Sequence, residues 1–153
     1  CPTVELQGDQ LGKAVAVLTA LSPVEVQFDD KQPIGFLADE NLILYPSGAS
    51  NEEVLARLPA DIVLATAAQC YAEVGNEEYL HQMALAVSVE VCGRLGISPP
   101  ADRLNGLRAH IPAGEERRAL EEVREMAKVF GDTICKELDL QRPRSDLQRA
   151  GER

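Results

Sequence analysis

Four side chains that can bind a metal ion stand in two pairs near the middle of the sequence. The pairs are Cys70-x-x-Glu73 and Glu78-x-x-His81, and a separation of three residues places both members on one face of a helix. If the chain bends at residues 75–76, two antiparallel helices carry the pairs toward each other. A thiolate, an imidazole and two carboxylates are ligands for a divalent transition metal such as zinc or iron. The spacing therefore predicts a metal site at the tip of a helical hairpin.

A structural interpretation competes with the metal site. The sequence contains one Glu-x-x-His motif, whereas carboxylate-bridged diiron bundles need two such motifs and two further glutamates. Glutamates near a hairpin tip are also expected as solvated helix caps. In this interpretation Cys70 is a packed thiol, His81 is a hydrogen-bonded imidazole, and no metal binds.

Other catalytic signatures do not occur in the sequence. It contains no GxSxG, P-loop, GxGxxG or HExxH motif and no acidic calcium-binding loop. Its serine and histidine residues do not have the order or setting of a catalytic triad. We therefore expect a protein that is not an enzyme. The alternative is a helical domain that binds a metal or small ligand at the hairpin tip, with or without enzymatic activity.

The elements that must position these residues begin with a helix and short strands. An apolar face predicts a helix over residues 10–21 with Asp9 as its cap. Alternating apolar side chains over 24–28 predict a strand, and two more strands follow at 34–38 and 42–45 after turn signals. We expect an antiparallel meander of three strands. Its apolar face needs a cover because an isolated small sheet is only marginally stable.

The remainder of the chain is predicted to be helical. A capping box at Ser50 begins a short helix that ends before Pro59. Asp61 then caps the first of two helices with few polar side chains, which together form a buried hairpin over 61–95. Regularly spaced apolar residues predict an amphipathic helix over 115–138.

These elements predict an α+β fold. An N-terminal helix and a short three-stranded antiparallel meander are followed by a helical bundle, which contains the hairpin and the amphipathic helix. A chain of 153 residues can bury enough surface to form one domain. We expect residues 1–140 to form that domain and residues 141–153 to be a polar, flexible tail.

The distribution of charge limits the classes of partner. The first hundred residues carry fourteen acidic and four basic side chains, whereas residues 101–153 carry eleven of each, so the net charge of -10 lies in the first part. An acidic surface favours a protein partner with a basic surface and disfavours direct binding to nucleic acid. The leading hypothesis is therefore a non-enzymatic acidic adaptor, which binds a protein through its acidic front half or an exposed strand edge. An acidic mimic of nucleic acid is a further alternative.

Cysteine usage and hydropathy bear on the cellular location. Cys70, Cys92 and Cys135 fall in predicted apolar helices and form no CxxC pair, so we expect three reduced core thiols in a cytoplasmic protein. The longest apolar stretch, residues 80–97, contains Gln82, Glu90 and Arg94, which predicts no membrane span.

In size, acidity and the order of an N-terminal helix followed by short strands, the chain resembles small secretion chaperones. The resemblance implies binding to a protein client, and the predicted hairpin over 61–95 is not part of it. A rich supply of apolar helix faces also favours a homodimer.

Overall fold

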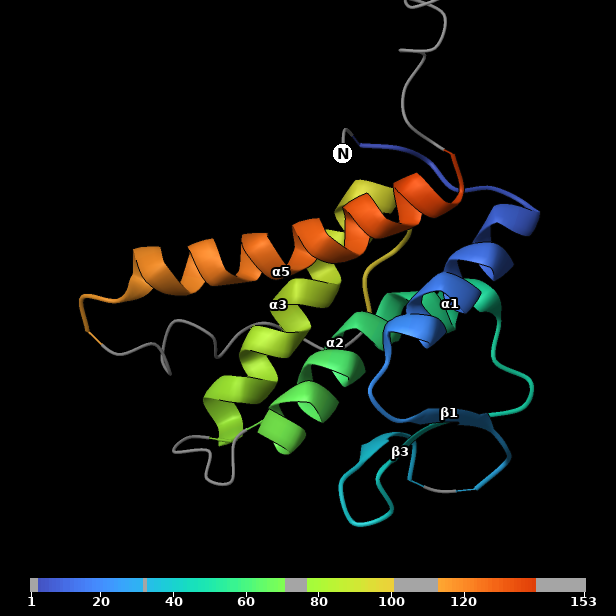
Figure 1. Cartoon of the computed structure of the whole chain (residues 1–153), viewed down its shortest axis with the longest axis horizontal. Helices are drawn as coiled ribbons and strands as arrows, with labels where there is room; N and C mark the ends of the chain where they lie inside the picture. The colour runs from blue at the N-terminus through green and yellow to red at the C-terminus, as the bar shows by residue number, and fades with distance from the viewer. Residues whose placement is uncertain (1–2, 32, 71–76, 101–112, 140–153) are drawn as a thin grey trace, which may run out of the picture.

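A computed structural model describes residues 3–31, 33–70, 77–100 and 113–139. The element order is α1 (Asp9–Leu21), β1 (Glu25–Phe28), β2 (Gly35–Leu37), β3 (Leu42–Tyr45), α2 (Asn51–Cys70), α3 (Glu77–Leu95) and α5 (Glu116–Glu137). Figure 1 shows α2 and α3 side by side, with α5 crossing α3, while α1 and the sheet lie around the N-terminal half of α2. The predicted α+β class with a helical bundle is confirmed.

The sheet is mixed, which corrects the predicted antiparallel meander. The strand order is β1-β3-β2, with β1 parallel to β3 and β2 antiparallel to β3. β3 is therefore the central strand, and Ile43, Leu44 and Tyr45 are all buried. An uninterrupted apolar run of this kind is typical of a strand covered on both faces.

The turn after β1 holds the parallel pair together. The N–H of Asp29 donates a hydrogen bond to the Tyr45 carbonyl at 2.9 Å. The Asp30 carboxylate accepts hydrogen bonds from the N–H of Ser47 at 3.1 Å and from its hydroxyl at 2.9 Å. These contacts fix the ends of β1 and β3 side by side, so that β2 pairs along the other edge of β3.

α1 has the predicted apolar face but a different cap. Gly8, and not Asp9, is the N-cap residue, and it adopts a positive φ of 59°. Ala14, Val15 and Leu18 are buried on the face that packs against α2. α1 thus covers the first half of α2.

α2 is one continuous helix, which corrects the predicted end before Pro59. The cap at Ser50 is confirmed, because its hydroxyl oxygen accepts a hydrogen bond from the N–H of Glu53 at 3.1 Å. Pro59 lies inside the helix. A proline there has no N–H to donate and crowds the preceding turn, which normally costs about 3 kcal/mol.

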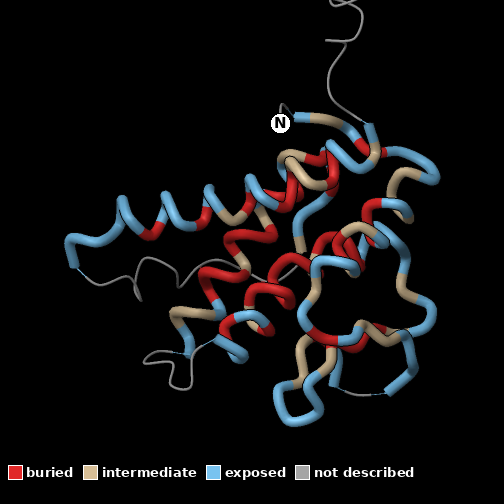
Figure 2. Tube along the Cα trace, viewed as in Figure 1, coloured by how far each residue is buried: buried red, intermediate tan, exposed pale blue. Residues whose placement is uncertain are grey.

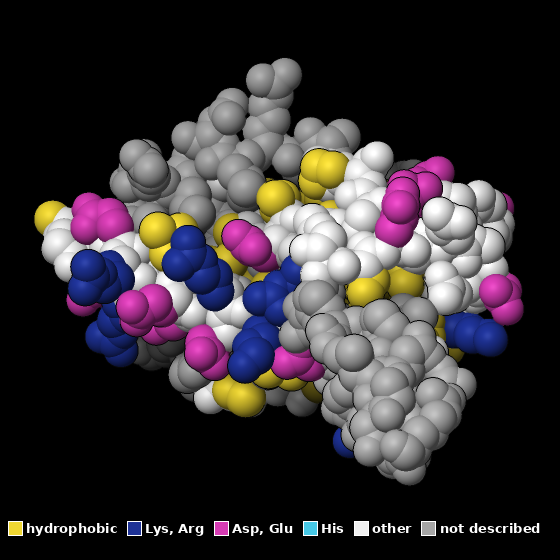
Figure 3. Space-filling model, turned by 90° about the horizontal axis from the view of Figure 1, so that it is seen from above, with side chains coloured by type: hydrophobic (Ala, Val, Ile, Leu, Met, Phe, Trp, Pro, Cys, Tyr) yellow, Lys and Arg dark blue, Asp and Glu magenta, His cyan; other side chains and the backbone are white. Residues whose placement is uncertain are grey.

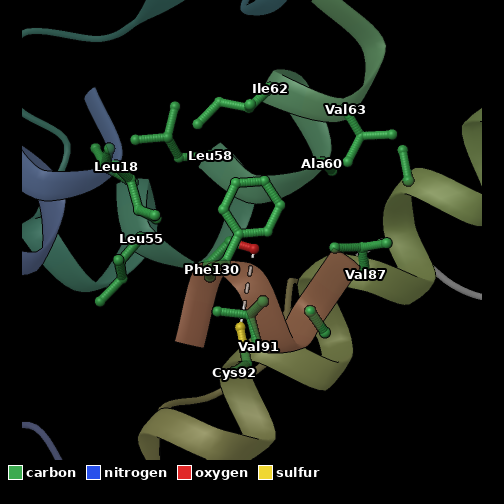
Figure 4. Close-up of a cluster of buried hydrophobic side chains, with 14 of the residues drawn as sticks. Leu18, Leu55, Leu58, Ala60, Ile62, Val63, Val87, Val91, Cys92 and Phe130 are labelled. Carbon is green, nitrogen blue, oxygen red and sulfur yellow. Dashed lines mark hydrogen bonds between the residues drawn. The ribbon is translucent and has the colours of Figure 1, made fainter. Parts of the chain in front are cut away.

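At Pro59, two backbone groups of α2 find partners on α3. In a regular helix the N–H of Ala60 donates to the carbonyl of Ala56. Here the Ala60 N–H donates to the Ser88 hydroxyl at 2.8 Å. The Ala56 carbonyl accepts from the Cys92 thiol at 3.8 Å, which is the dashed line in Figure 4. Ser88 and Cys92 lie one turn apart on α3, so this side of α3 supports the proline turn. The predicted hairpin of two packed helices is confirmed.

The C-terminal end of α3 is capped by the N-terminal segment of the chain. The N–H groups of Val4 and Leu6 donate to the carbonyls of the last two residues of α3, at 2.8 and 3.0 Å. Gly96 follows with a positive φ of 68°, and the N–H of Ile97 donates five residues back at 3.1 Å. This is the Schellman arrangement, which favours glycine at the left-handed position.

α5 confirms the amphipathic helix predicted over 115–138. Figure 2 shows buried and exposed residues alternating along α5, whereas α2 and α3 are buried along much of their length. Phe130 points from α5 into the core cluster, which also contains Leu58, Ile62 and Val91 (Figure 4). α5 thereby closes one side of the hairpin.

The prediction of three reduced core thiols is correct only for Cys92, which is free and buried. Cys70 is free but exposed at the end of α2. Cys135 is buried and disulfide-bonded.

Residues of α1, the sheet, α2, α3 and α5 form a single hydrophobic core. The extent of the domain over 1–140 stays a prediction, and the predicted tail, 141–153, lies outside the described residues. No helix in the described segments has the length and apolar character needed to cross a membrane.

Candidate functional site

The structure describes three of the four predicted metal ligands. Cys70 is the last residue of α2, and Glu78 and His81 are in the first two turns of α3; all three are exposed. Glu73 lies outside the described residues. Within the described segments, no group of three or more His, Cys, Asp and Glu side chains is placed to hold a metal ion. Since that search does not include Glu73, the zinc or iron site stays a prediction.

His81 lines a small pocket between the hairpin and the sheet. The pocket has a volume of about 170 Å³, and its wall includes Arg57 and Asp61 of α2 and Gly35 and Phe36 of β2. His81 therefore shares this pocket with side chains that the hairpin-tip prediction did not include.

Asp61 is the buried polar centre beside this pocket. Sequence reasoning interpreted it as a helix cap, but it lies in the middle of α2 with only 7% of its surface exposed. One carboxylate oxygen accepts a hydrogen bond from the Tyr45 hydroxyl at 2.5 Å, and the other accepts from the N–H of Phe36 at 3.2 Å. Burial, followed by the charge and hydrogen bond of Asp61, raises the pKa of Tyr45 well above its usual value. The carboxylate thus ties two strands to α2.

This contact also decides which edge of the sheet is open. β2 is an edge strand, and the Phe36 N–H that faces away from β3 is taken by Asp61. β1 forms the other edge, where Glu25 is exposed and Phe28 is 47% exposed. The predicted binding through a strand edge is therefore better accommodated at β1 than at β2, and it stays a prediction.

A larger apolar groove lies among α2, α3 and α5. It has a volume of about 430 Å³. The residues that line it are Ile62, Val63, Thr66 and Ala67 of α2, Tyr79, Leu80 and Met83 of α3, and Glu122, Met126, Val129 and Phe130 of α5. Most of these side chains are apolar, so the groove can bury apolar groups of a ligand or partner.

The groove exists because the apolar face of α5 is wider than the strip of that face that packs into the hydrophobic core. Val123, Ala127 and Phe130 are buried in the middle of that face. Met126 and Val129 lie on its flank, where Met126 is half-buried and Val129 is 59% exposed. An exposed apolar flank beside a hollow is a feature of binding surfaces.

The polar residues at the groove lie near the first turns of α3 and α5. Glu122 lines the groove and pairs with Arg118 at 3.5 Å on the surface. Partial burial, followed by the charges of Glu122 and Glu115, raises the pKa of Tyr79. The negative potential of the nearby carboxylates thus extends to the Tyr79 hydroxyl.

Carboxylates outnumber guanidinium groups near the N-termini of α3 and α5. The exposed charged residues there are Glu77, Glu78, Glu115, Glu116, Arg117, Arg118, Glu121 and Glu122. The outer face of α5 is different, because Figure 3 shows basic and acidic side chains intermingled, with small hydrophobic patches between them. The groove end is therefore net acidic beside a charge-balanced helix face.

Sequence reasoning missed this groove. The amphipathic helix over 115–138 was predicted from a regular apolar repeat that did not include Met126 and Val129. Those two side chains widen the apolar face of α5 on one side. This extra width was the sequence pattern that could have indicated the groove. The residues of α2 and α3 that line the rest of the groove could not be identified from the sequence, because the sequence does not show where α5 crosses these helices.

No known protein family matches the chain, and no curated protein or solved structure shows significant similarity to it.

Proposed function

We propose that this protein is a non-enzymatic, acidic adaptor or chaperone-like domain that binds a protein partner with a basic surface. The observation that carries the proposal is the apolar groove with a net acidic end, in a chain of net charge -10. Apolar walls provide affinity by burial, and the surrounding negative charge steers a basic partner toward them. The cytoplasm is the proposed location, and a homodimer stays a prediction.

Native mass spectrometry of the tagged full chain, purified gently from its own cells, tests this function. At low salt we expect a stoichiometric complex with a protein of net positive charge. Raising the salt to about 0.5 M shortens the electrostatic range to a few ångströms and should release the partner. A chain that stays free of any protein partner at every salt concentration would contradict the proposal.

Competition with DNA distinguishes an adaptor from an acidic mimic of nucleic acid. An acidic mimic of nucleic acid occupies the DNA-binding surface of its partner, so DNA added to the complex should displace the protein. We expect DNA to leave the complex intact. Displacement by duplex DNA at constant ionic strength would favour the mimic.

A further inference from the structure

The groove among α2, α3 and α5 has walls from three helices and a lining that suits an apolar helix face. Val63 and Met83 are buried residues of its floor, whereas Val129 at its rim is largely exposed. An amphipathic helix binds such a groove by inserting side chains spaced three or four residues apart. Methionines at Met83 and Met126 suit this use, because their flexible side chains adapt to different apolar groups.

A small polar molecule fits the groove less well than a helix does. Thr66, Tyr79 and Glu122 are the lining residues with polar side-chain atoms. Small-molecule sites usually bring several polar groups together to fix the orientation of the ligand. Helix recognition instead depends mainly on apolar anchors, which this lining provides.

Charge argues against a second copy of the chain as the occupant. The copy would bring a net charge of -10 toward the exposed carboxylates at Glu77, Glu78 and Glu122. Like charges brought together at an interface are unfavourable. Lysine or arginine residues at the corresponding end of the occupant would have the complementary charge.

We propose that the groove is the docking site for an amphipathic α-helix of a partner protein, with apolar anchors against Met83 and Phe130 and basic residues beside Glu122. This inference rests on the proposed function and names its contact surface. It predicts that binding needs both the apolar face of the helix and its positive charge.

A designed peptide tests the proposal with the full chain. The probe is a labelled leucine–lysine peptide of about 18 residues, or five helical turns, with its leucines on one face. A second peptide has the same composition in an order that scatters the leucines, and a third has glutamate in place of lysine. Fluorescence anisotropy should show binding of the first peptide, with affinity at least about tenfold higher than for either control peptide.

Two variants locate the binding site. Val129→Glu places a charge at the exposed rim, and Thr66→Trp fills the groove from an exposed position on α2. Each should weaken peptide binding at least about tenfold. Leu120→Glu is the matched control, because Leu120 is 43% exposed on α5 and does not line the groove. It should leave the affinity within about twofold, and thermal unfolding should show that all three variants remain folded.

Several outcomes would overturn the docking site. Equal binding of the scattered-leucine peptide, or no effect of both Val129→Glu and Thr66→Trp, would contradict it. A bound small molecule released by Val129→Glu, with no peptide binding, would identify a small-ligand site instead. If the natural partner is retained equally by Val129→Glu, the proposed function stands and the docking site is wrong. If no partner is found with any form of the protein, the function itself fails.

Discussion

The buried carboxylate of Asp61 joins strands β2 and β3 to α2. A buried carboxylate is costly unless hydrogen bonds stabilise it. The Tyr45 hydroxyl and the Phe36 N–H provide two of those bonds. Gly35 allows the close approach of β2, because a Cβ there would lie 3.3 Å from a carboxylate oxygen of Asp61. The sheet therefore contacts the middle of α2 through this carboxylate.

Tyr45→Phe should lower the free energy of unfolding at neutral pH by about 1–3 kcal/mol, because Asp61 loses a buried hydrogen bond. The folded pKa of Tyr45 is raised above the unfolded value of about 10. Its stabilisation is therefore complete below about pH 10 and is lost as the pH rises further. Urea unfolding at a series of alkaline pH values should show a shallower loss of stability for Tyr45→Phe than for the wild type. Equal slopes would contradict this assignment.

The two free thiols among the described residues should differ in reactivity. Burial, followed by the charge of Glu52, raises the pKa of Cys92 to about 12, whereas Cys70 is exposed. The thiolate is the reactive form, so iodoacetamide near neutral pH should modify Cys70 in the folded protein and Cys92 only after unfolding. Peptide mapping by mass spectrometry measures both sites. Equal rates at the two positions in the folded protein would show that the burial of Cys92 is wrong.

At the scale of elements, the end of α3 depends on a close contact with the N-terminal segment. Gly96 has a φ of 68°, and a Cβ at this position would lie 3.0 Å from both the Glu5 Cα and the Val4 carbonyl oxygen. The same segment supplies the N–H groups that cap α3. Space and backbone conformation both require glycine there.

Gly96→Ala should lower the free energy of unfolding by about 1–3 kcal/mol through backbone strain and this contact. Gly93→Ala is the matched control, since Gly93 is an exposed residue inside α3 and a Cβ there would meet nothing within 4 Å. Alanine should raise stability at that position by about 0.5–1 kcal/mol. Chemical denaturation of both variants measures the difference. A Gly96→Ala protein as stable as Gly93→Ala would contradict the capping contact.

At the scale of the whole molecule, the oxidation state of Cys135 depends on the cellular compartment of the protein, because Cys135 forms a disulfide. Cys135 is buried near the end of α5. The cytoplasm keeps most thiols reduced, whereas secreted proteins keep disulfides. The disulfide therefore makes the proposed cytoplasmic location testable.

Adding a reducing agent to the purified protein should lower the free energy of unfolding by about 2–4 kcal/mol, which is typical for loss of a disulfide. A Cys135→Ser variant should lose this dependence on reductant. Rapid acid quenching and alkylation of intact cells then reports the state in the cell. A cytoplasmic protein should show Cys135 reduced there, and an oxidised Cys135 would contradict that location.

Much of the local structure was predictable because its signals lie within a few residues. The Ser50 cap, the apolar repeat of α5 and the span of β3 each depend on short-range spacing, and the structure confirms them. Of the site, sequence reasoning singled out His81 and predicted the hairpin that carries it. Asp61 was recognised but was given the role of a cap.

Only the tertiary structure decided the strand order, the continuity of α2 through Pro59 and the groove. Each depends on residues distant in sequence, such as Ser88 meeting Ala60 and Asp30 meeting Ser47. A local pattern records which face of a helix or strand is apolar, but it does not record which element covers that face. In this chain α5 leaves Met126 and Val129 partly uncovered, and that geometry creates the surface on which the proposed function depends.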